Sequence, residues 1–267
     1  MNSPENPEAN YSAPNCKAMW VDTHCHLQLD GRDPVELMDR AVDVSWMVIP
    51  GVDLESSRAA IALAARHPGR LQPTVGLHPH DAEHWPAQRS GLIELMAEAA
   101  AVGETGLDYY RNLAPKADQR ASFAAHLALA VEHDLPVVVH CRDAFSDVFE
   151  MLGDASLGER AVLHCWTGGS RWTKRFAELG VTFSFAGPVA FETGETIRIG
   201  ATHADPARCL VETDTPYLSP PPYRDEQNEP ARVALVGEAL ASVWGLDVET
   251  VAELTTAHAV RVFGAPS

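Results

Sequence analysis

The sequence has few cysteines and few basic side chains. Its 267 residues include five cysteines, an odd number without the dense spacing of a disulfide-stabilised secreted domain, so we expect reduced thiols and a cytoplasmic protein. Lysine and arginine number 20 against 37 aspartates and glutamates, which gives a formal net charge of −17. This balance argues against a broad basic surface that grips nucleic-acid phosphates non-specifically. An anionic substrate would need local positive charge, such as bound metal.

Long apolar segments are also lacking. No stretch approaches the roughly 20 residues that cross a bilayer, so we expect no membrane partner. Residues 1–18 lack the basic start and apolar run of a signal peptide, and their Asn, Pro, Ser and Glu content is typical of a flexible polar tail. Residues 19–267 have the length of a single large domain. The oligomeric state stays open, with a monomer as one option.

Short apolar runs alternate with segments of helical periodicity, the pattern of strand–helix units around a parallel sheet. Eight such units predict a (β/α)₈ TIM barrel, an architecture of about 250 residues whose chemistry lies at the carboxyl ends of its strands. Residues 228–264 should form two further helices, separated near Gly245, with Asp247 as the N-cap of the second. The predicted strands are 20–23, 46–50, 71–75, 101–103, 136–139, 161–163, 181–185 and 209–212.

Residues that can bind metal recur where these runs end. Each histidine alone is more often a hydrogen-bonded structural residue than a ligand, and an open doubly wound sheet could also be built from such units. Donors at several separate strand ends favour a closed barrel instead. Together, four imidazoles and two carboxylates supply the donors of a two-metal site, namely His24, His26, Glu104, His140, His164 and Asp214.

The most specific local element is "VDTHCHL". Alternation along a strand aims His24 and His26 at one ion while Cys25 points away. Cys25 could itself be a thiolate ligand, but Cys141 and Cys165 also directly follow candidate histidines. We therefore expect all three cysteines on the helix-facing side of the barrel wall, as small apolar packing residues.

Two carboxylates are the catalytic candidates. Glu104 lies in "VGETGLDYY" and can bridge two cations, although a helix cap or rim charge is the alternative. Asp214 can bind metal, orient a water and accept its proton. Glu212 would lie one layer deeper, as an outer partner of the ligands or a buried structural carboxylate. Asp108 is either such an outer partner or a turn residue.

Other residues near the strand ends are candidates for substrate binding. Histidines of "TVGLHPH" could meet substrate at the rim or be surface histidines. Arginines could clamp a phosphate, since guanidinium binds it bidentately, and aromatic rings could stack on bases, with solvated charge and packing as alternatives. The candidates are His78, His80, Arg142, Arg224, Tyr109 and Trp166, with Arg111 and Tyr110 beside them.

Seven motifs in order, "THCHL", "GLHPH", "GETGLDYY", "HCRDA", "HCWTGG", "ETDTPYLSP" and "NEP", resemble the TatD family of metal-dependent deoxyribonucleases within the amidohydrolase superfamily. The resemblance implies a (β/α)₈ barrel, a divalent-metal cluster and hydrolysis of DNA phosphodiester bonds, often from the 3′ end. By this resemblance His24 and His26 ligate one metal and His140 and His164 the second. Glu104 is then shared, and Asp214 binds metal and handles the water proton.

Two departures from the family pattern leave other functions open. Gln28 stands where an acidic residue is usual, and Arg224 is followed by Asp225, Glu226 and Gln227 where the family often has Gly-Lys-Arg. The alternative is a hydrolase of a small phosphoester, amide or lactone, and a less favoured one is a non-catalytic scaffold stabilised by metal. For the enzyme we expect two divalent cations, Mg²⁺ or Mn²⁺ during turnover or Zn²⁺ as isolated, although imidazole ligands favour Zn²⁺, Fe or Mn²⁺.

Overall fold

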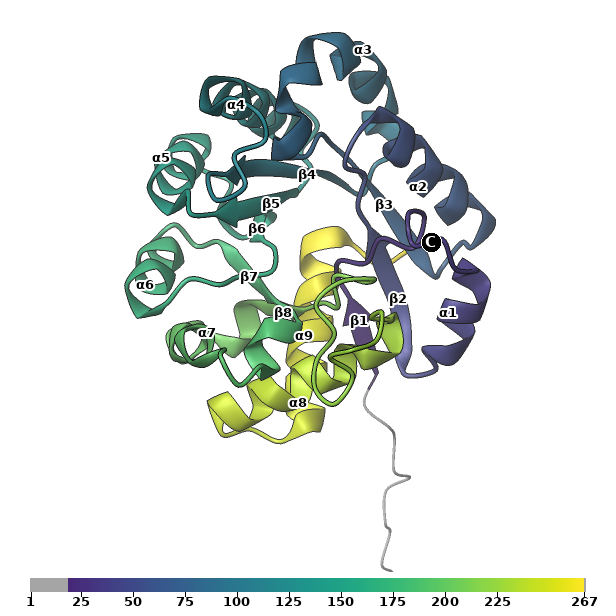
Figure 1. The fold of residues 1–267 in the computed structure, drawn as a ribbon, viewed down its shortest axis with the longest axis vertical. Helices are drawn as coiled ribbons and strands as arrows, with labels where there is room; N and C mark the ends of the chain where they lie inside the picture. Colours follow the sequence, from purple (N-terminus) through teal and green to yellow (C-terminus); the bar gives the residue numbers. More distant parts are fainter. Residues whose placement is uncertain (1–18, 267) are drawn as a thin grey trace, which may run out of the picture.

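The computed structural model describes residues 19–266, so the tail predicted for residues 1–18, with Cys16, lies outside the described residues. Eight strands form one sheet in which neighbours in sequence are neighbours in space (Figure 1). Every adjacent pair is parallel. The strands are β1 (Trp20–Asp22), β2 (Val44–Ile49), β3 (Leu71–Val75), β4 (Ala101–Asp108), β5 (Val137–Arg142), β6 (Ala161–Leu163), β7 (Thr182–Phe185) and β8 (Cys209–Val211).

The first and last strands meet and close the sheet. The Thr23 N–H donates to the Val211 carbonyl at 3.1 Å, and the Asp214 N–H donates to the His24 carbonyl at 2.8 Å. An isolated parallel bridge joins Cys25 to Thr215 just beyond the strands. The (β/α)₈ barrel predicted from the sequence is confirmed.

Helices alternate with the strands and surround them (Figure 1). Gly245, at φ 67°, ends α8, and the Asp247 side chain accepts the Thr250 N–H at 2.7 Å at the start of α9, so both predicted signals are confirmed. The helices are α1 (Pro34–Arg40), α2 (Leu54–Arg66), α3 (Trp85–Leu95), α4 (Lys116–Glu132), α5 (Phe145–Ala155), α6 (Ser170–Glu178), α7 (Glu195–Ala201), α8 (Val233–Trp244) and α9 (Val248–Phe263). Short 3₁₀ turns are η1 (Pro79–His84), η2 (Met96–Glu98), η3 (Gly158–Arg160), η4 (Gly187–Ala190), η5 (Pro206–Arg208) and η6 (Pro230–Arg232).

Strand β4 continues to Asp108, five residues beyond the predicted end at Gly103. Gly103 and Gly106 have φ values of 128° and 136°, which side chains with a Cβ rarely adopt. A Cβ at Gly106 would lie 2.1 Å from the His140 carbonyl oxygen, so glycine lets β4 pass close to β5. Residues that normally mark a strand end therefore keep this strand in the sheet, with Glu104 between them.

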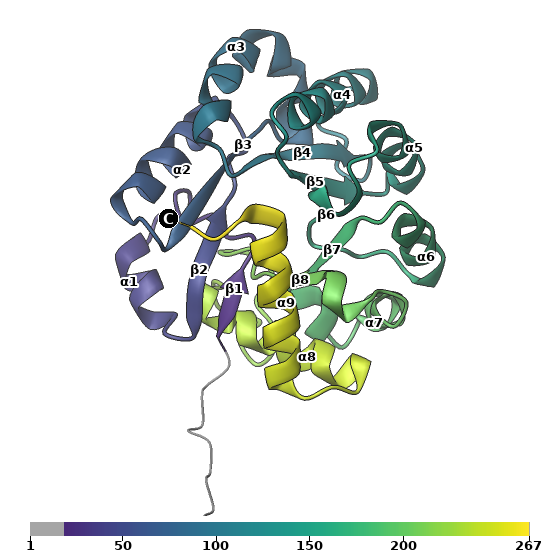
Figure 2. The ribbon, with the colours of Figure 1, turned by 180° about the vertical axis from the view of Figure 1, so that it is seen from behind.

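Helix α9 covers the amino end of the barrel, as Figure 2 shows from behind. It contacts η5, which precedes β8, through an Arg261 Nη2 hydrogen bond to the Ala207 carbonyl at 2.6 Å. Its Ala259, Val262 and Phe263 join one buried apolar cluster with strand residues Val21, Trp46, Val48, Ala101, Val138, Val162 and Leu210. Among residues 19–266 no helix is long and apolar enough to cross a membrane.

Candidate active site

The six candidate ligands gather at the carboxyl end of the barrel. They come from the ends of β1, β5, β6 and β8 and from within β4. Five of them border a cavity of about 790 Å³, and His24 is completely buried. The residues that border the cavity are His26, Glu104, His140, His164 and Asp214.

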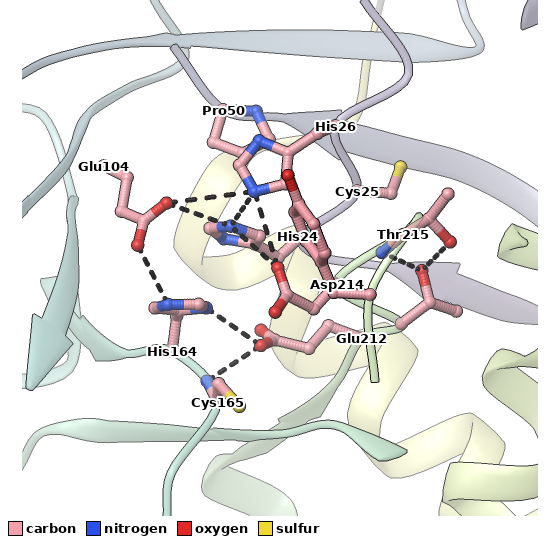
Figure 3. Close-up of polar contacts among 12 residues, drawn as sticks. His24, Cys25, His26, Pro50, Glu104, His164, Cys165, Glu212, Asp214 and Thr215 are labelled. Carbon is pink, nitrogen blue, oxygen red and sulfur yellow. Dashed lines mark hydrogen bonds and ion pairs between the residues drawn. The ribbon is translucent and has the colours of Figure 1, made fainter. Parts of the chain in front are cut away.

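One group of donors converges around His24 and His26 (Figure 3). Their Nε2 atoms lie 3.2 Å apart. Glu104 Oε2 lies 3.4 Å from Nε2 of His24 and 3.9 Å from that of His26, and Asp214 Oδ1 lies 3.7 Å and 3.4 Å from the same two atoms. Ligands of a tetrahedral ion with bonds of about 2.0–2.1 Å lie about 3.3 Å apart. His24, His26 and Glu104 therefore fit a single small cation, and Asp214, which is grouped with His24 and His164, lies beside it.

A second group faces the other oxygen of the same carboxylate. Glu104 Oε1 lies 3.1 Å from His140 Nδ1, 3.1 Å from His164 Nε2 and 3.4 Å from His78 Nε2. Each oxygen of Glu104 thus meets its own set of imidazole nitrogens. The arrangement has the form of a carboxylate that joins two adjacent cation sites.

His78 lies deeper than the sequence analysis placed it. Its side chain is only 14% exposed, and its nitrogen belongs with Glu104 and His140 to one group of potential metal ligands. His80 lies further out and shares Asp108 with His140, because Asp108 Oδ2 is 2.9 Å from His80 Nε2 and 3.2 Å from His140 Nε2. The two histidines of one motif therefore take different positions.

Asp108 and Glu212 both contact candidate ligands. Asp108 also accepts the Arg111 N–H at 2.7 Å, so it is a turn residue as well as a partner of His140. Glu212 Oε1 lies 3.1 Å from His164 Nδ1 and accepts the Cys165 N–H at 2.8 Å. The bond to Nδ1 turns the His164 ring so that Nε2 faces Glu104.

Burial and charge act against each other in this site. Burial raises the pKa of Glu104, but His164 and His78 outweigh it and hold this pKa well below its usual value. Burial likewise opposes ionisation of Asp214, yet the hydrogen bond to His26 and the charges of His24 and His164 lower its pKa. Burial lowers the pKa of His164, and Glu104 and Glu212 raise it well above the usual value. Ionised carboxylates facing imidazoles suit a cation that replaces the ring protons.

Two buried side chains of α4 hold the strand ends, and the sequence analysis missed them. His126 Nε2 accepts the Leu77 N–H at 3.1 Å, while its Nδ1–H donates to the Ser122 carbonyl at 2.7 Å. Gln119 accepts the Asp108 N–H at 2.8 Å and donates to the Asp108 carbonyl at 3.2 Å. The two residues lie seven apart, so a polar pair on one inward helix face was the signal available.

The remaining substrate-binding candidates divide into two sets. Arg142 and Arg111 border the cavity, and the Arg142 guanidinium lies 4.2 Å from the Tyr110 ring centroid. The other three have packing or hydrogen-bonding contacts elsewhere. Arg224 donates to the Ser219 carbonyl at 2.9 Å, the Tyr109 hydroxyl to Asp147 at 2.6 Å, and the buried Trp166 Nε1–H to Thr173 at 2.9 Å. These contacts favour the packing alternative for Tyr109 and Trp166.

The cysteines beside the candidate ligands differ in their position relative to the cavity. Cys25 is fully buried, with Sγ 3.7 Å from the Val48 carbonyl. Cys25 does not border the cavity, whereas Cys141 and Cys165 do. Burial raises the pKa of the Cys141 and Cys165 thiols. Protonated thiols are poor metal ligands, and the four described cysteines are free.

A (β/α)₈ barrel with imidazoles and carboxylates converging at its carboxyl end has the arrangement of a catalytic metal site. Comparisons with known proteins place the chain among metal-dependent hydrolases. The family model described as "TatD related DNase" matches residues 21–264. The chain is 36% identical over 258 residues to the Escherichia coli K12 protein named "Uncharacterized metal-dependent hydrolase YcfH", covering 91% of this chain and 95% of that protein.

A second relative carries a more specific name. The "3'-5' ssDNA/RNA exonuclease TatD" of Pectobacterium parmentieri WPP163 is 34% identical over 242 residues, covering 87% of this chain and 93% of its own length. The crystal structure of YJJV, a TatD homologue from Escherichia coli K12, superposes with a TM-score of 0.87 at 25% identity, covering 93% of this chain and 99% of that one. The chain belongs to the family of TatD-related DNases and is a hydrolytic enzyme.

Proposed function

We propose that this hydrolase is a deoxyribonuclease that removes nucleotides from the 3′ end of single-stranded DNA with two divalent cations. The proposal rests on the position of Glu104 between two groups of histidines. Its Oε2 faces the ring nitrogens of His24 and His26, and its Oε1 contacts those of His140 and His164. A relative named as a 3'-5' ssDNA/RNA exonuclease supports the substrate class.

The ligand assignment follows from the two donor groups. His24, His26, Glu104 and Asp214 would hold one cation, and Glu104, His140 and His164 the other. His78 Nε2 is a further donor for the second position. Imidazole-rich sets favour Mn²⁺ or Zn²⁺ over Mg²⁺, so we expect Mn²⁺ to support turnover better than Mg²⁺.

Bound divalent cations would polarise the scissile phosphodiester and lower the pKa of the attacking water. The protein supplies the remaining functions. Asp214, whose pKa is lowered by His26 and its neighbours despite burial, is ionised at neutral pH and can orient that water and accept its proton. Arg142, at the cavity wall, can pair with a non-bridging phosphate oxygen of the substrate.

The alternative is hydrolysis of a small phosphoester, amide or lactone at the same centre. It is favoured by the loop after Arg224, where Glu226 forms a 2.5 Å ion pair with Arg232 and adds no positive charge for DNA. Membership of a family of hydrolases argues against the non-catalytic scaffold.

The deciding experiment adds Mg²⁺, Mn²⁺ or Zn²⁺ separately to metal-stripped protein with single-stranded DNA labelled at either end. Stepwise shortening from the 3′ end that disappears in Asp214→Asn is the expected result. Asp225→Asn is the matched control, because Asp225 is exposed and does not border the cavity. Cleavage of a small phosphodiester alone would favour the alternative, and cleavage of circular single-stranded DNA would replace exonuclease with endonuclease activity.

A further inference from the structure

One wall of the cavity carries exposed apolar side chains beside the charged cluster. Tyr217 is 60% exposed and Leu29 is 50% exposed, and both border the cavity together with the partly buried Leu218. The Tyr217 ring centroid lies 6.1 Å from that of His26, with the rings near perpendicular. Apolar side chains, one of them an aromatic ring, thus border the same cavity as the carboxylates and imidazoles of the candidate metal centre.

The backbone that carries Tyr217 is fixed on both sides. The Tyr217 N–H donates to the Asp214 carbonyl at 2.8 Å, and its carbonyl accepts from Asn228 Nδ2 at 2.8 Å. Asn228 is fully buried and also donates to the Thr213 carbonyl at 2.8 Å. The exposed ring therefore projects from a rigid support, so little conformational entropy is lost when a ligand contacts it.

The next residue holds an unfavourable backbone conformation. Leu218 has a φ of 57°, in the left-handed region that bulky side chains avoid. Its carbonyl oxygen approaches Gly187 so closely that a Cβ there would lie 1.9 Å away. Such conformations persist only where the surroundings enforce them, and they concentrate at ligand-binding sites. Here the enforced conformation places Tyr217 and Leu218 at the cavity.

We propose that Tyr217, with Leu29 and Leu218, forms a shelf on which a nucleobase adjoining the cleaved bond stacks. A nucleotide joins a phosphate to a flat apolar ring, which matches a charged centre beside an aromatic wall. Stacking on a tyrosine tolerates any base, so the shelf selects nucleic acid over small phosphoesters without reading sequence. This inference rests on the proposed nuclease function. It gives Tyr217 the stacking role for which the sequence offered Tyr109, Tyr110 and Trp166 as candidates, with packing as the alternative.

The test compares two substrates with variants of one residue, with Mn²⁺ present. The substrates are oligothymidylate and the same oligomer with a base-less tetrahydrofuran residue at its terminal or penultimate 3′ position. Removal of the base should lower kcat/KM of the wild type by between about fivefold and 150-fold. Tyr217→Ala should show a similar loss on intact DNA and no further loss on base-less DNA, whereas Tyr217→Phe should behave as wild type.

Tyr223→Ala is the matched control, because Tyr223 is an exposed tyrosine of the same loop outside the cavity. Thermal unfolding checks that each variant is folded. Equal losses for Tyr217→Ala on both substrates, or no loss on either, would overturn the shelf while DNA cleavage by the wild type leaves the nuclease function standing. If the wild type cleaves neither oligomer with any of the three cations, the nuclease function fails and the shelf with it.

Discussion

At the carboxyl end of the barrel, side chains that prefer water are buried against one another, whereas at the amino end α9 packs apolar side chains against strand residues. Glu104, 3% exposed, and His24, fully buried, depend on each other and on a cation for compensation. Val262 and Phe263, each 7% exposed, are stabilised simply by leaving water. One end is built for chemistry and the other for stability, so substitutions at the two ends should have separable effects.

The largest effect is expected from Glu104→Gln, which keeps the shape of the side chain and removes its charge. Both donor groups lose their shared ligand, so kcat/KM on DNA should fall by roughly 10³-fold or more, with lower metal content. The free energy of unfolding of the metal-free protein should also decrease at neutral pH, because ionised Glu104 stabilises the folded state and its loss leaves the buried His164 and His140 without their anionic partner. Glu98→Gln, an exposed glutamate in η2 at the opposite end of β4, is the control. Normal turnover and full metal occupancy in Glu104→Gln would contradict the bridging assignment.

At the amino end, Phe263→Ala should lower the stability of the fold and leave the activity of the folded protein unchanged. Deleting a buried phenyl ring costs about 3–5 kcal/mol of unfolding free energy, measurable by urea denaturation. Under conditions where the variant is folded, its kcat/KM should match that of the wild type. Val260→Ala, in the same helix but 41% exposed, should change neither property. A loss of activity in folded Phe263→Ala would show that the two ends are coupled.

The effect expected at His126, a buried residue of α4 in the helix layer behind the site, is smaller than those at Glu104 and Phe263. Burial, opposed by the hydrogen bond to Ser122, lowers its pKa from 6.5 to about 4. A lowered histidine pKa means that the folded state favours the neutral ring. Its stabilisation is complete above pH 6.5 and is lost as the pH falls towards 4, by up to about 3 kcal/mol.

The measurement compares unfolding free energies of wild type and His126→Gln between pH 7 and pH 4. Glutamine can accept the Leu77 N–H, so the variant should fold but lose this part of the pH dependence. The wild type should lose stability relative to the variant as the pH falls. Parallel curves for the two proteins would show that His126 does not contribute.

The smallest effect is expected from Arg224→Gln. The Arg224 guanidinium lies 3.5 Å from the Phe191 ring centroid and does not border the cavity. We expect KM for DNA to stay within about twofold of wild type and stability to fall by at most about 1 kcal/mol. Arg142→Gln, at the cavity wall, should raise KM instead. A larger KM increase for Arg224→Gln than for Arg142→Gln would restore the clamp role suggested for Arg224.

The barrel and its donor positions were predictable because both follow from local patterns. Strand-like alternation predicted that His24 and His26 share one side, and their Nε2 atoms do meet at 3.2 Å although β1 ends at Asp22. Parallel strands bring their carboxyl ends to one face of the barrel. The length of β4 was not predictable from these rules, since Gly103 normally signals a strand end. Its effect here depends on the close approach to β5, which only the assembled barrel supplies.

Residues outside the strands were harder to place. His78 reaches Glu104 because the loop after β3 is held by His126, a contact across 49 positions in sequence. Trp166 follows a candidate ligand directly, yet it packs with Phe145, Phe176 and Phe183. Side-chain direction in such loops is set by distant partners, which periodicity and spacing do not encode.

The position of α9 has a consequence for synthesis of the chain. All eight strands precede it in the sequence, so every candidate metal ligand leaves the ribosome before α9, the helix that covers the amino end of the barrel. Until Val262 and Phe263 are synthesised, Val138, Val162 and Leu210 lack the apolar partners that α9 supplies. A chain that stopped before Val248 would keep the complete set of donors but expose that interior to water and to other chains. Burial of the amino end of the barrel therefore requires the complete chain, through to α9.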